Sequence, residues 1–150
     1  MKIIKHKQIL EDSWTHLADS DEISSGDITL SISRWKNEKN ELKSHSGNIG
    51  VRLAPADNVE DITADLQNIS LIALDFPAFT DGRSFSQARL LRSRYGFTGE
   101  IRAIGGFITD QVFYLHRVGV DAFELKDQDQ LNAALSTMND FTVCYQSSTN

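Results

Sequence analysis

Residues 69–75, Ile-Ser-Leu-Ile-Ala-Leu-Asp, are the stretch of this chain that decides its fold. The run is apolar except for Ser70, and it ends at the carboxylate of Asp75. An apolar run of this length is typical of a parallel strand that is covered on both faces. The stretch therefore predicts the buried central strand of a parallel sheet.

Short apolar runs alternate with amphipathic segments on either side of this strand. The alternation predicts right-handed βαβ units, in which each helix packs on the sheet between two parallel strands. The predicted strands are 49–53, 69–74, 101–104, 120–125 and 142–145. The predicted helices run through Ile62 and Leu66, from Ser84 to Gly96, over 110–118, and along the apolar face of Leu131, Ala134, Leu135 and Met138.

The chain has 150 residues, the length of one domain with one core. It is too short for an eight-stranded parallel barrel, which usually needs about 250 residues. The sequence predicts the α/β class: a single domain with an open, mostly parallel sheet of about five strands flanked by helices, preceded by a short N-terminal α+β segment.

Residues 1–47 form that polar N-terminal segment, which we expect to pack on an α/β domain of residues 48–145, followed by a tail of residues 146–150. Within it, Ile28, Leu30 and Ile32 alternate with polar residues and predict a short strand, which leads into a helix. Trp14 and Trp35 must bury against the α/β part or against a second chain, so a homodimer is an alternative.

Composition excludes several classes of protein. Fifteen basic residues against 21 acidic residues give a net charge of −6, which argues against a nucleic-acid partner. No apolar run approaches the ~20 residues of a membrane span, and the N-terminus lacks a signal-peptide pattern, so we expect a cytoplasmic protein. Cys144 is the single cysteine, and the four histidines lack ligand spacing; neither predicts a metal site.

Ligands of parallel sheets bind beyond the carboxyl ends of the strands, which is where the unusual residues of this chain fall. Between Asp81 and Arg102, five arginines stand against two acids. Guanidinium groups bind oxyanions through two parallel hydrogen bonds, so this stretch predicts a site for a small anion or a phosphate-bearing cofactor. The expected anion- or cofactor-binding residues are Phe79, Thr80, Gly82, Arg83, Arg89, Arg92, Arg102, Gly105 and Asp110, and the candidate catalytic carboxylates are Asp75 and Asp81.

A purely structural interpretation stays open for these residues. Residues 80–82, Thr-Asp-Gly, are also a turn signature, and arginines on a helix surface are usually solvated. Residues 105–110, Gly-Gly-Phe-Ile-Thr-Asp, lie between a predicted strand and a predicted helix, as phosphate-binding turns do, but they match neither the dinucleotide fingerprint nor the Walker A motif. The motif alone does not name a cofactor.

Several strings of this sequence resemble the DUF934 family of small bacterial proteins. They are residues 76–83, Phe-Pro-Ala-Phe-Thr-Asp-Gly-Arg; 86–92, Ser-Gln-Ala-Arg-Leu-Leu-Arg; 94–96, Arg-Tyr-Gly; 99–103, Gly-Glu-Ile-Arg-Ala; 110–111, Asp-Gln; 119–124, Gly-Val-Asp-Ala-Phe-Glu; 50–53, Gly-Val-Arg-Leu; and 33–35, Ser-Arg-Trp. The resemblance extends from about residue 10 to residue 125. Members of this family are described as probable oxidoreductases or accessory proteins in sulfite reduction.

The resemblance implies an accessory protein of assimilatory sulfite reduction that docks to sulfite reductase or to its electron donor. The alternative is an oxidoreductase-like enzyme that binds an oxyanion or a phosphate-bearing cofactor at the carboxyl ends of the strands. Many family members carry a cysteine where this chain has Val118, so a mechanism through that thiol is not expected here.

Overall fold

The structure is a computed structural model that describes residues 2–76, 83–106 and 111–138. The predicted site residues Phe79, Thr80, Asp81, Gly82 and Asp110 lie outside the described residues. The predicted strand at 142–145 and the tail at 146–150 also lie outside them.

One sheet of eight strands organises the described residues, in the order β2-β1-β8-β7-β6-β5-β4-β3. From β3 to β8 all neighbouring strands are parallel, whereas β1 runs antiparallel to both β2 and β8. The strands are β1 (Lys2–Lys5), β2 (Gln8–Glu11), β3 (Thr15–His16), β4 (Ile28–Ser31), β5 (Ile49–Leu53), β6 (Leu71–Phe76), β7 (Glu100–Gly105) and β8 (Ala122–Leu125).

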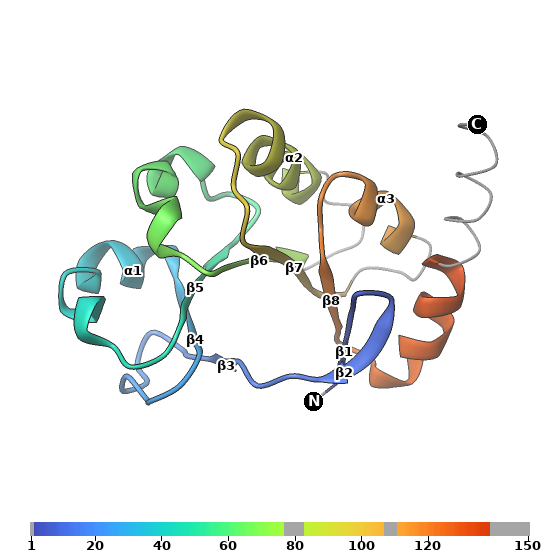
Figure 1. The fold of residues 1–150 in the computed structure, drawn as a ribbon, viewed down its shortest axis with the longest axis horizontal. Helices are drawn as coiled ribbons and strands as arrows, with labels where there is room; N and C mark the ends of the chain where they lie inside the picture. The colour runs from blue at the N-terminus through green and yellow to red at the C-terminus, as the bar shows by residue number, and fades with distance from the viewer. Residues whose placement is uncertain (1, 77–82, 107–110, 139–150) are drawn as a thin grey trace.

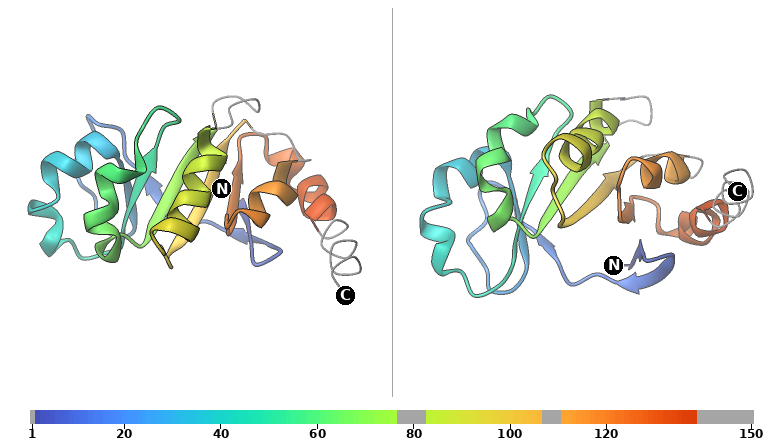
Figure 2. Two further views of the ribbon diagram at one scale, coloured as in Figure 1. Left: turned by 90° about the horizontal axis from the view of Figure 1, so that it is seen from above. Right: turned by 45° about the horizontal axis from the view of Figure 1, so that its top comes forward.

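The strands from β3 to β8 lie side by side in the order in which they occur in the chain. Because each crossover then proceeds in the same direction and with the same hand, the helices all fall on one face. Figure 1 shows the result: the sheet curls into an arc with the helices along its outer, convex side, and Figure 2 shows these helices in a row.

The N-terminal segment closes the inner, concave side of this arc. The β1–β2 hairpin extends the sheet beyond β8, and the chain then crosses to the opposite edge, where β3 pairs with β4 (Figure 1). The α/β class is therefore confirmed, but the predicted open sheet of about five strands is wrong. The prediction failed because residues 1–47, expected to form a separate segment with a single strand, contribute four strands to the same sheet.

Helical segments follow most of the parallel strands. The oxygen of the Ser31 side chain accepts a hydrogen bond from the Arg34 backbone N–H, so Ser31 caps the first helix. The helix expected through Ile62 and Leu66 is instead a series of 3₁₀ turns. The segments are α1 (Ile32–Glu38), α2 (Arg83–Arg89), α3 (Gln111–Arg117), the 3₁₀ segments η1 (Glu41–Ser44), η2 (Val59–Asn68) and η4 (Gln128–Gln130), and the π-helical segment η3 (Leu90–Arg94); residues 131–138 are also helical.

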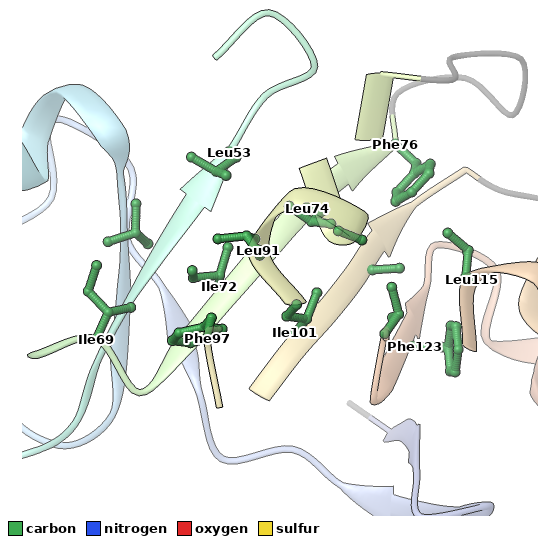
Figure 3. Close-up of a cluster of buried hydrophobic side chains, with 14 of the residues drawn as sticks. Leu53, Ile69, Ile72, Leu74, Phe76, Leu91, Phe97, Ile101, Leu115 and Phe123 are labelled. Carbon is green, nitrogen blue, oxygen red and sulfur yellow. The ribbon is translucent and has the colours of Figure 1, made fainter. Parts of the chain in front are cut away.

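The hydrophobic core lies between the convex face of the sheet and the helices. Ile72 and Leu74 of β6 lie beside Leu91, which is fully buried (Figure 3), and Phe76 at the end of the strand packs edge-on against Phe85. Trp35 is buried in this same core, within one chain. None of the described helices is long and apolar enough to cross a membrane.

The concave face carries polar side chains because successive residues of a strand point to opposite faces. Ile101 and Ala103 of β7 belong to the core, whereas Arg102 between them faces the concave side and is 1% exposed. Glu124 of β8 and Thr29 of β4 are likewise buried polar residues. The sequence predicted a sheet flanked by helices; the described helices lie along the convex face, and the N-terminal segment crosses the concave one (Figure 1).

Candidate functional site

A cavity of about 330 Å³ opens on the concave side, at the carboxyl ends of the parallel strands. It is the position where parallel sheets and barrels place their ligands, because the strand ends and their loops converge there. Each of the strands from β3 to β7 contributes to its wall. The lining residues are His16, Ser31, Arg52, Ala54, Asp57, Ala73, Asp75 and Ile104.

Arg52 of β5 is the cation of this cavity. Its Nη1 donates to the backbone oxygen of Thr29 at 2.8 Å and to the Thr29 hydroxyl at 2.7 Å, and its Nη2 donates to the backbone oxygen of Leu17 at 2.5 Å. Among the described residues, no acceptor lies within hydrogen-bond distance of Arg52 Nε. Because Nε–H and the second Nη2–H share one edge of the planar group, this edge is a donor pair suited to an oxyanion.

Burial affects the charge of both Arg52 and its neighbour Asp75. Desolvation lowers the pKa of Arg52, while the negative charges of Asp19 and Asp75 oppose that shift. Arginine nevertheless stays protonated at any physiological pH. Desolvation raises the pKa of the Asp75 carboxyl, and the positive charge of Arg52 opposes this only in part. Asp75 therefore retains a proton to higher pH than an ordinary aspartate, as a proton donor requires.

The loop after β5 is held in place on the cavity wall by two side chains. Asp57 accepts a hydrogen bond from the Ala54 backbone N–H at 2.7 Å. Gln87 of α2 is 4% exposed, and its Nε2 donates to the backbone oxygens of both Ala54 and Asp57 at 2.9 Å. The hydroxyl of Ser84, also in α2, donates to the Asp75 backbone oxygen at 3.1 Å. Helix α2, which lies on the convex side of the sheet, thus holds both the loop after β5 and the end of β6.

A buried network of charged residues lies next to the cavity on the concave face. Arg102 is its centre, with Nη1 at 2.9 Å from Asp12 and 3.1 Å from Glu124, and Nη2 at 3.0 Å from Glu100. Asp12 belongs to the N-terminal segment, so this arginine ties that segment to the sheet. Lys5 of β1 adds an ion pair to Glu100.

His16 connects the buried network to the cavity. Its Nε2 lies 2.9 Å from the Glu124 carboxylate and its Nδ1 lies 2.7 Å from the Thr29 hydroxyl, which also accepts from Arg52. A continuous chain of hydrogen bonds therefore runs from Arg102 through Glu124, His16 and Thr29 to Arg52. Such chains fix the orientation of each member, which preorganises the Arg52 guanidinium.

The network keeps its groups ionised despite burial. Burial alone would raise the pKa of the Glu124 carboxyl, but the hydrogen bonds and positive charges of His16 and Arg102 outweigh it and hold that pKa below its usual value. Desolvation would lower the pKa of Arg102, but the neighbouring Glu100 and Asp12 raise it above its ordinary value. The concave interior is therefore built on charge pairs that satisfy one another.

Asp12, His16 and Glu124 each offer a ligand atom, and these atoms lie within 4.8 Å of one another, which is a spacing that a metal ion requires. Sequence spacing did not indicate this cluster, since its members are far apart in the chain. Arg102 contacts both of its carboxylates and already supplies the positive charge that a metal would bring. The arrangement fits an ion-pair network better than a metal centre.

The structure separates the arginines that the sequence grouped into one anion site. Arg89 and Arg92 line a groove between α2 and α3, on the outer side of the sheet. Arg102 lies in the concave network, because strand alternation turns it away from the helices. Arg83 is exposed at the start of α2, and Gly105 ends β7. Asp75 is the described candidate that lines the cavity.

Arg52 and His16 are site residues that our list of candidates lacked. A signal for Arg52 was present in the alternation of segment 49–53. Ile49, Val51 and Leu53 are buried on one face of this strand, so Arg52 lies on the opposite face together with Gly50. The same alternation places Arg102 and Glu124 on one face of their strands. His16 carried no such signal, because its strand has two residues and its partners come from distant strands.

Residues 50–150 match the model of a protein family described as "Bacterial protein of unknown function (DUF934)". The chain belongs to this family. The matched region begins in β5 and includes Arg52, Asp75, Arg102 and Glu124. Asp12, His16 and Thr29, which also belong to the concave network, lie in the part of the chain with β1 to β4, which precedes the matched region. No curated protein matches the chain.

Proposed function

We propose that this DUF934 protein is a cytoplasmic accessory protein of assimilatory sulfite reduction, and that its concave cavity binds a small oxyanion such as sulfite. The observation that carries the binding step is the Nε edge of Arg52, for which the described residues provide no acceptor. The link to sulfite comes from the description of the family that the sequence resembles, and it is a proposal on that ground.

The chemistry of the cavity supports a small anion over a larger cofactor. Its volume of about 330 Å³ lies at the lower end of the range of about 300–1,000 Å³ for ligand pockets. A planar guanidinium held by three hydrogen bonds binds an oxyanion without further ordering of its side chain, so little conformational entropy is lost. Asp75 would repel a dianion when ionised, but in its protonated form it donates a hydrogen bond to the anion.

A titration of the purified protein with sulfite, sulfate and phosphate tests the binding step. We expect calorimetry to detect sulfite binding that Arg52→Lys abolishes, because an ammonium cannot replace the donor fork. Arg34→Lys is the matched control, since Arg34 bonds to Glu38 and to the Ala18 backbone outside the cavity wall. Equal sulfite affinity in wild type and Arg52→Lys would contradict the proposal.

The accessory role is tested in the cell and with the partner enzyme. A strain that lacks the gene should grow poorly with sulfate as its sole sulfur source, and the native protein should co-purify with sulfite reductase or its electron donor. Normal growth of the deletion strain would count against any role in sulfite reduction. Sedimentation of the purified chain would decide whether it acts as a monomer or a homodimer.

The raised pKa of Asp75 favours a second function, an oxidoreductase-like enzyme in which this carboxyl gives a proton to a bound oxyanion. Such an enzyme would take its electrons from a partner or from a phosphate-bearing cofactor. The absorbance spectrum of the freshly purified protein distinguishes the two functions, because a bound flavin or haem absorbs visible light. A colourless protein that binds sulfite but turns over no substrate would favour the accessory role over the enzyme.

A further inference from the structure

A groove of about 1,110 Å³ lies between α2 and α3, on the face opposite to the cavity. Phe85, Arg89 and Ser93 form one wall, and Gln111, Tyr114 and Arg117 form the other. Its volume exceeds the range of about 300–1,000 Å³ that is typical for pockets of small ligands. The dimensions therefore suit a chain segment rather than a single small ion.

The groove is positively charged although the protein is acidic. Three arginines, Arg89, Arg92 and Arg117, line it, and none of the described lining residues is Asp or Glu. The net charge of the whole chain is −6. A local positive strip on an acidic protein attracts and orients an acidic partner, while the rest of the surface repels it.

The three arginines differ in what they offer to a partner. Arg92 is engaged internally: it donates to the backbone oxygens of Phe97, Gly99 and Gly119 and pairs with Asp121. Arg89 is exposed, and its guanidinium makes no hydrogen bond or ion pair with any described residue. Arg117 is also exposed and lies over the Phe113 ring, with Cζ 6.0 Å from its centroid.

Aromatic surface accompanies the charge. Tyr114 is 52% exposed, which is unusual for a large side chain, and Phe85 on the opposite wall is half-buried. Tyrosine and arginine are the residue types that most often dominate the energy of protein interfaces. A groove with both types is suited to a segment that combines carboxylates with at least one apolar anchor.

We propose that the α2–α3 groove docks an acidic segment of a partner protein, with its carboxylates on Arg89 and Arg117 and an apolar side chain between Phe85 and Tyr114. The inference deepens the proposed function and rests on its accessory role, because it names the surface through which the protein holds its partner. The two surfaces then have separate functions: the helices on the convex side bind the partner, and the strand ends on the concave side bind the anion.

The test uses the full-length protein and a fluorescein-labelled twelve-residue peptide of Glu and Asp with one Leu and one Phe. We expect fluorescence anisotropy to detect binding that weakens steeply with salt, and at least tenfold weaker binding to the double variant Arg89→Glu, Arg117→Glu. Arg89→Glu alone should already weaken binding severalfold, and this exposed residue can change without disturbing the fold. Arg94→Glu is the matched control, because Arg94 is exposed but does not line the groove.

Three outcomes would overturn the inference. The first is equal affinity of wild type and Arg89→Glu for the acidic peptide, and the second is equal or tighter binding of a peptide with Lys in place of Glu and Asp. The third is displacement of the peptide by inorganic phosphate or by a single-stranded oligonucleotide beyond the effect of sodium chloride at the same ionic strength. Arg52→Lys should bind the peptide normally. A wild-type protein that binds the peptide but not sulfite would refute the anion cavity alone, and a wild-type protein that binds sulfite but not the peptide would refute the groove alone.

Discussion

His16 and Glu124 form a hydrogen bond of 2.9 Å, although four strands separate β3 from β8 in the order of the sheet. Only a sheet that curls strongly can bring these two strands within reach of one another. The bond, together with the ion pair of Arg102 and Asp12, fixes the N-terminal segment across the concave side. The curl thus converts one face of the sheet into an interior with its own polar network.

The first prediction concerns Glu124→Gln. The pKa of Glu124 is lowered in the folded protein, so the unfolded chain takes up the proton first as the pH falls. The stabilisation by Glu124 is complete above the unfolded pKa of about 4.3 and is lost as the pH falls through the folded pKa. We expect Glu124→Gln to lower the free energy of unfolding by about 2 kcal/mol at pH 7, and by less at pH 3.

Urea denaturation at the two pH values measures this difference. Glu38→Gln is the matched control, since Glu38 forms an i,i+4 ion pair with Arg34 on the surface and should cost only about 0.5 kcal/mol. A Glu124 variant whose loss of stability is the same at pH 3 as at pH 7 would contradict the linkage.

The sequence predicted the elements of this fold better than their arrangement. Strand alternation and apolar runs correctly indicated β4 to β8, because the buried face of each of these strands can be recognised from the apolar residues of its own sequence. Strands β1 to β3 were missed, since they are only two to four residues long and β2 and β3 lie at the two edges of the sheet. The pairing of β1 with β8 and of β3 with β4 also joins separate parts of the chain. The curl could not be predicted either, because it follows from the order of the strands and not from any one of them.

The site was predictable in its position but not in its composition. The rule that ligands bind at the carboxyl ends of parallel strands led to the edge of the sheet where the structure has a cavity lined by Asp75. Residues close in sequence, such as Arg89, Arg92 and Arg102, were expected to form one site, yet a helix and a strand turn them to opposite sides of the sheet. Arg52 and His16 reach the cavity only through tertiary contacts.

The second prediction separates Arg92 from Arg89. Arg92→Ala removes four hydrogen bonds and leaves Asp121 without its partner guanidinium, so it should cost about 3 kcal/mol of stability. Arg89→Ala should change stability by less than about 0.5 kcal/mol, because Arg89 is exposed. Thermal denaturation of both variants checks this. Equal losses would mean that the two arginines have the same role in the fold.

The third prediction concerns Gly105 at the end of β7. Its φ is +123°, and a Cβ there would lie 2.5 Å from the Phe76 backbone oxygen. Gly105→Ala should therefore cost more than about 3 kcal/mol, since both the backbone angle and the close approach exclude a side chain. Gly96→Ala is the matched control: its φ is +62°, but nothing lies within 4 Å of the added Cβ, so we expect a cost of about 1 kcal/mol. Similar melting temperatures of the two variants would contradict the steric argument.

The fourth prediction concerns the β1–β2 hairpin, whose two turn residues, His6 and Lys7, have φ values of 54° and 59°. A two-residue turn with positive φ at both positions strongly favours glycine at the second one. We therefore expect Lys7→Gly to stabilise the protein by about 1 kcal/mol. A lower melting temperature of Lys7→Gly than of wild type would show that the Lys7 side chain contributes more than the turn strain costs.

The last prediction concerns Asp75, which we expect to matter more for function than for stability. Burial raises its pKa, so above that pKa the folded protein carries an ionised carboxyl that is less favourable than in the unfolded chain. Asp75→Asn removes this penalty, and the melting temperature at pH 7 should stay the same or rise slightly. Because Asp75 is exposed to solvent, we expect the gain to remain below about 0.5 kcal/mol.

The functional effect of Asp75→Asn should be much larger. In the oxidoreductase-like enzyme the Asp75 carboxyl gives a proton to the oxyanion, which an amide cannot do, so under that function the variant should fail to restore growth on sulfate in the deletion strain while it still binds sulfite at Arg52. Asp57→Asn is a matched control on the same cavity wall, because an asparagine side-chain oxygen can still accept the Ala54 N–H bond. Full growth with Asp75→Asn would remove the carboxyl from the proposed mechanism and leave Arg52 as the basis of the site.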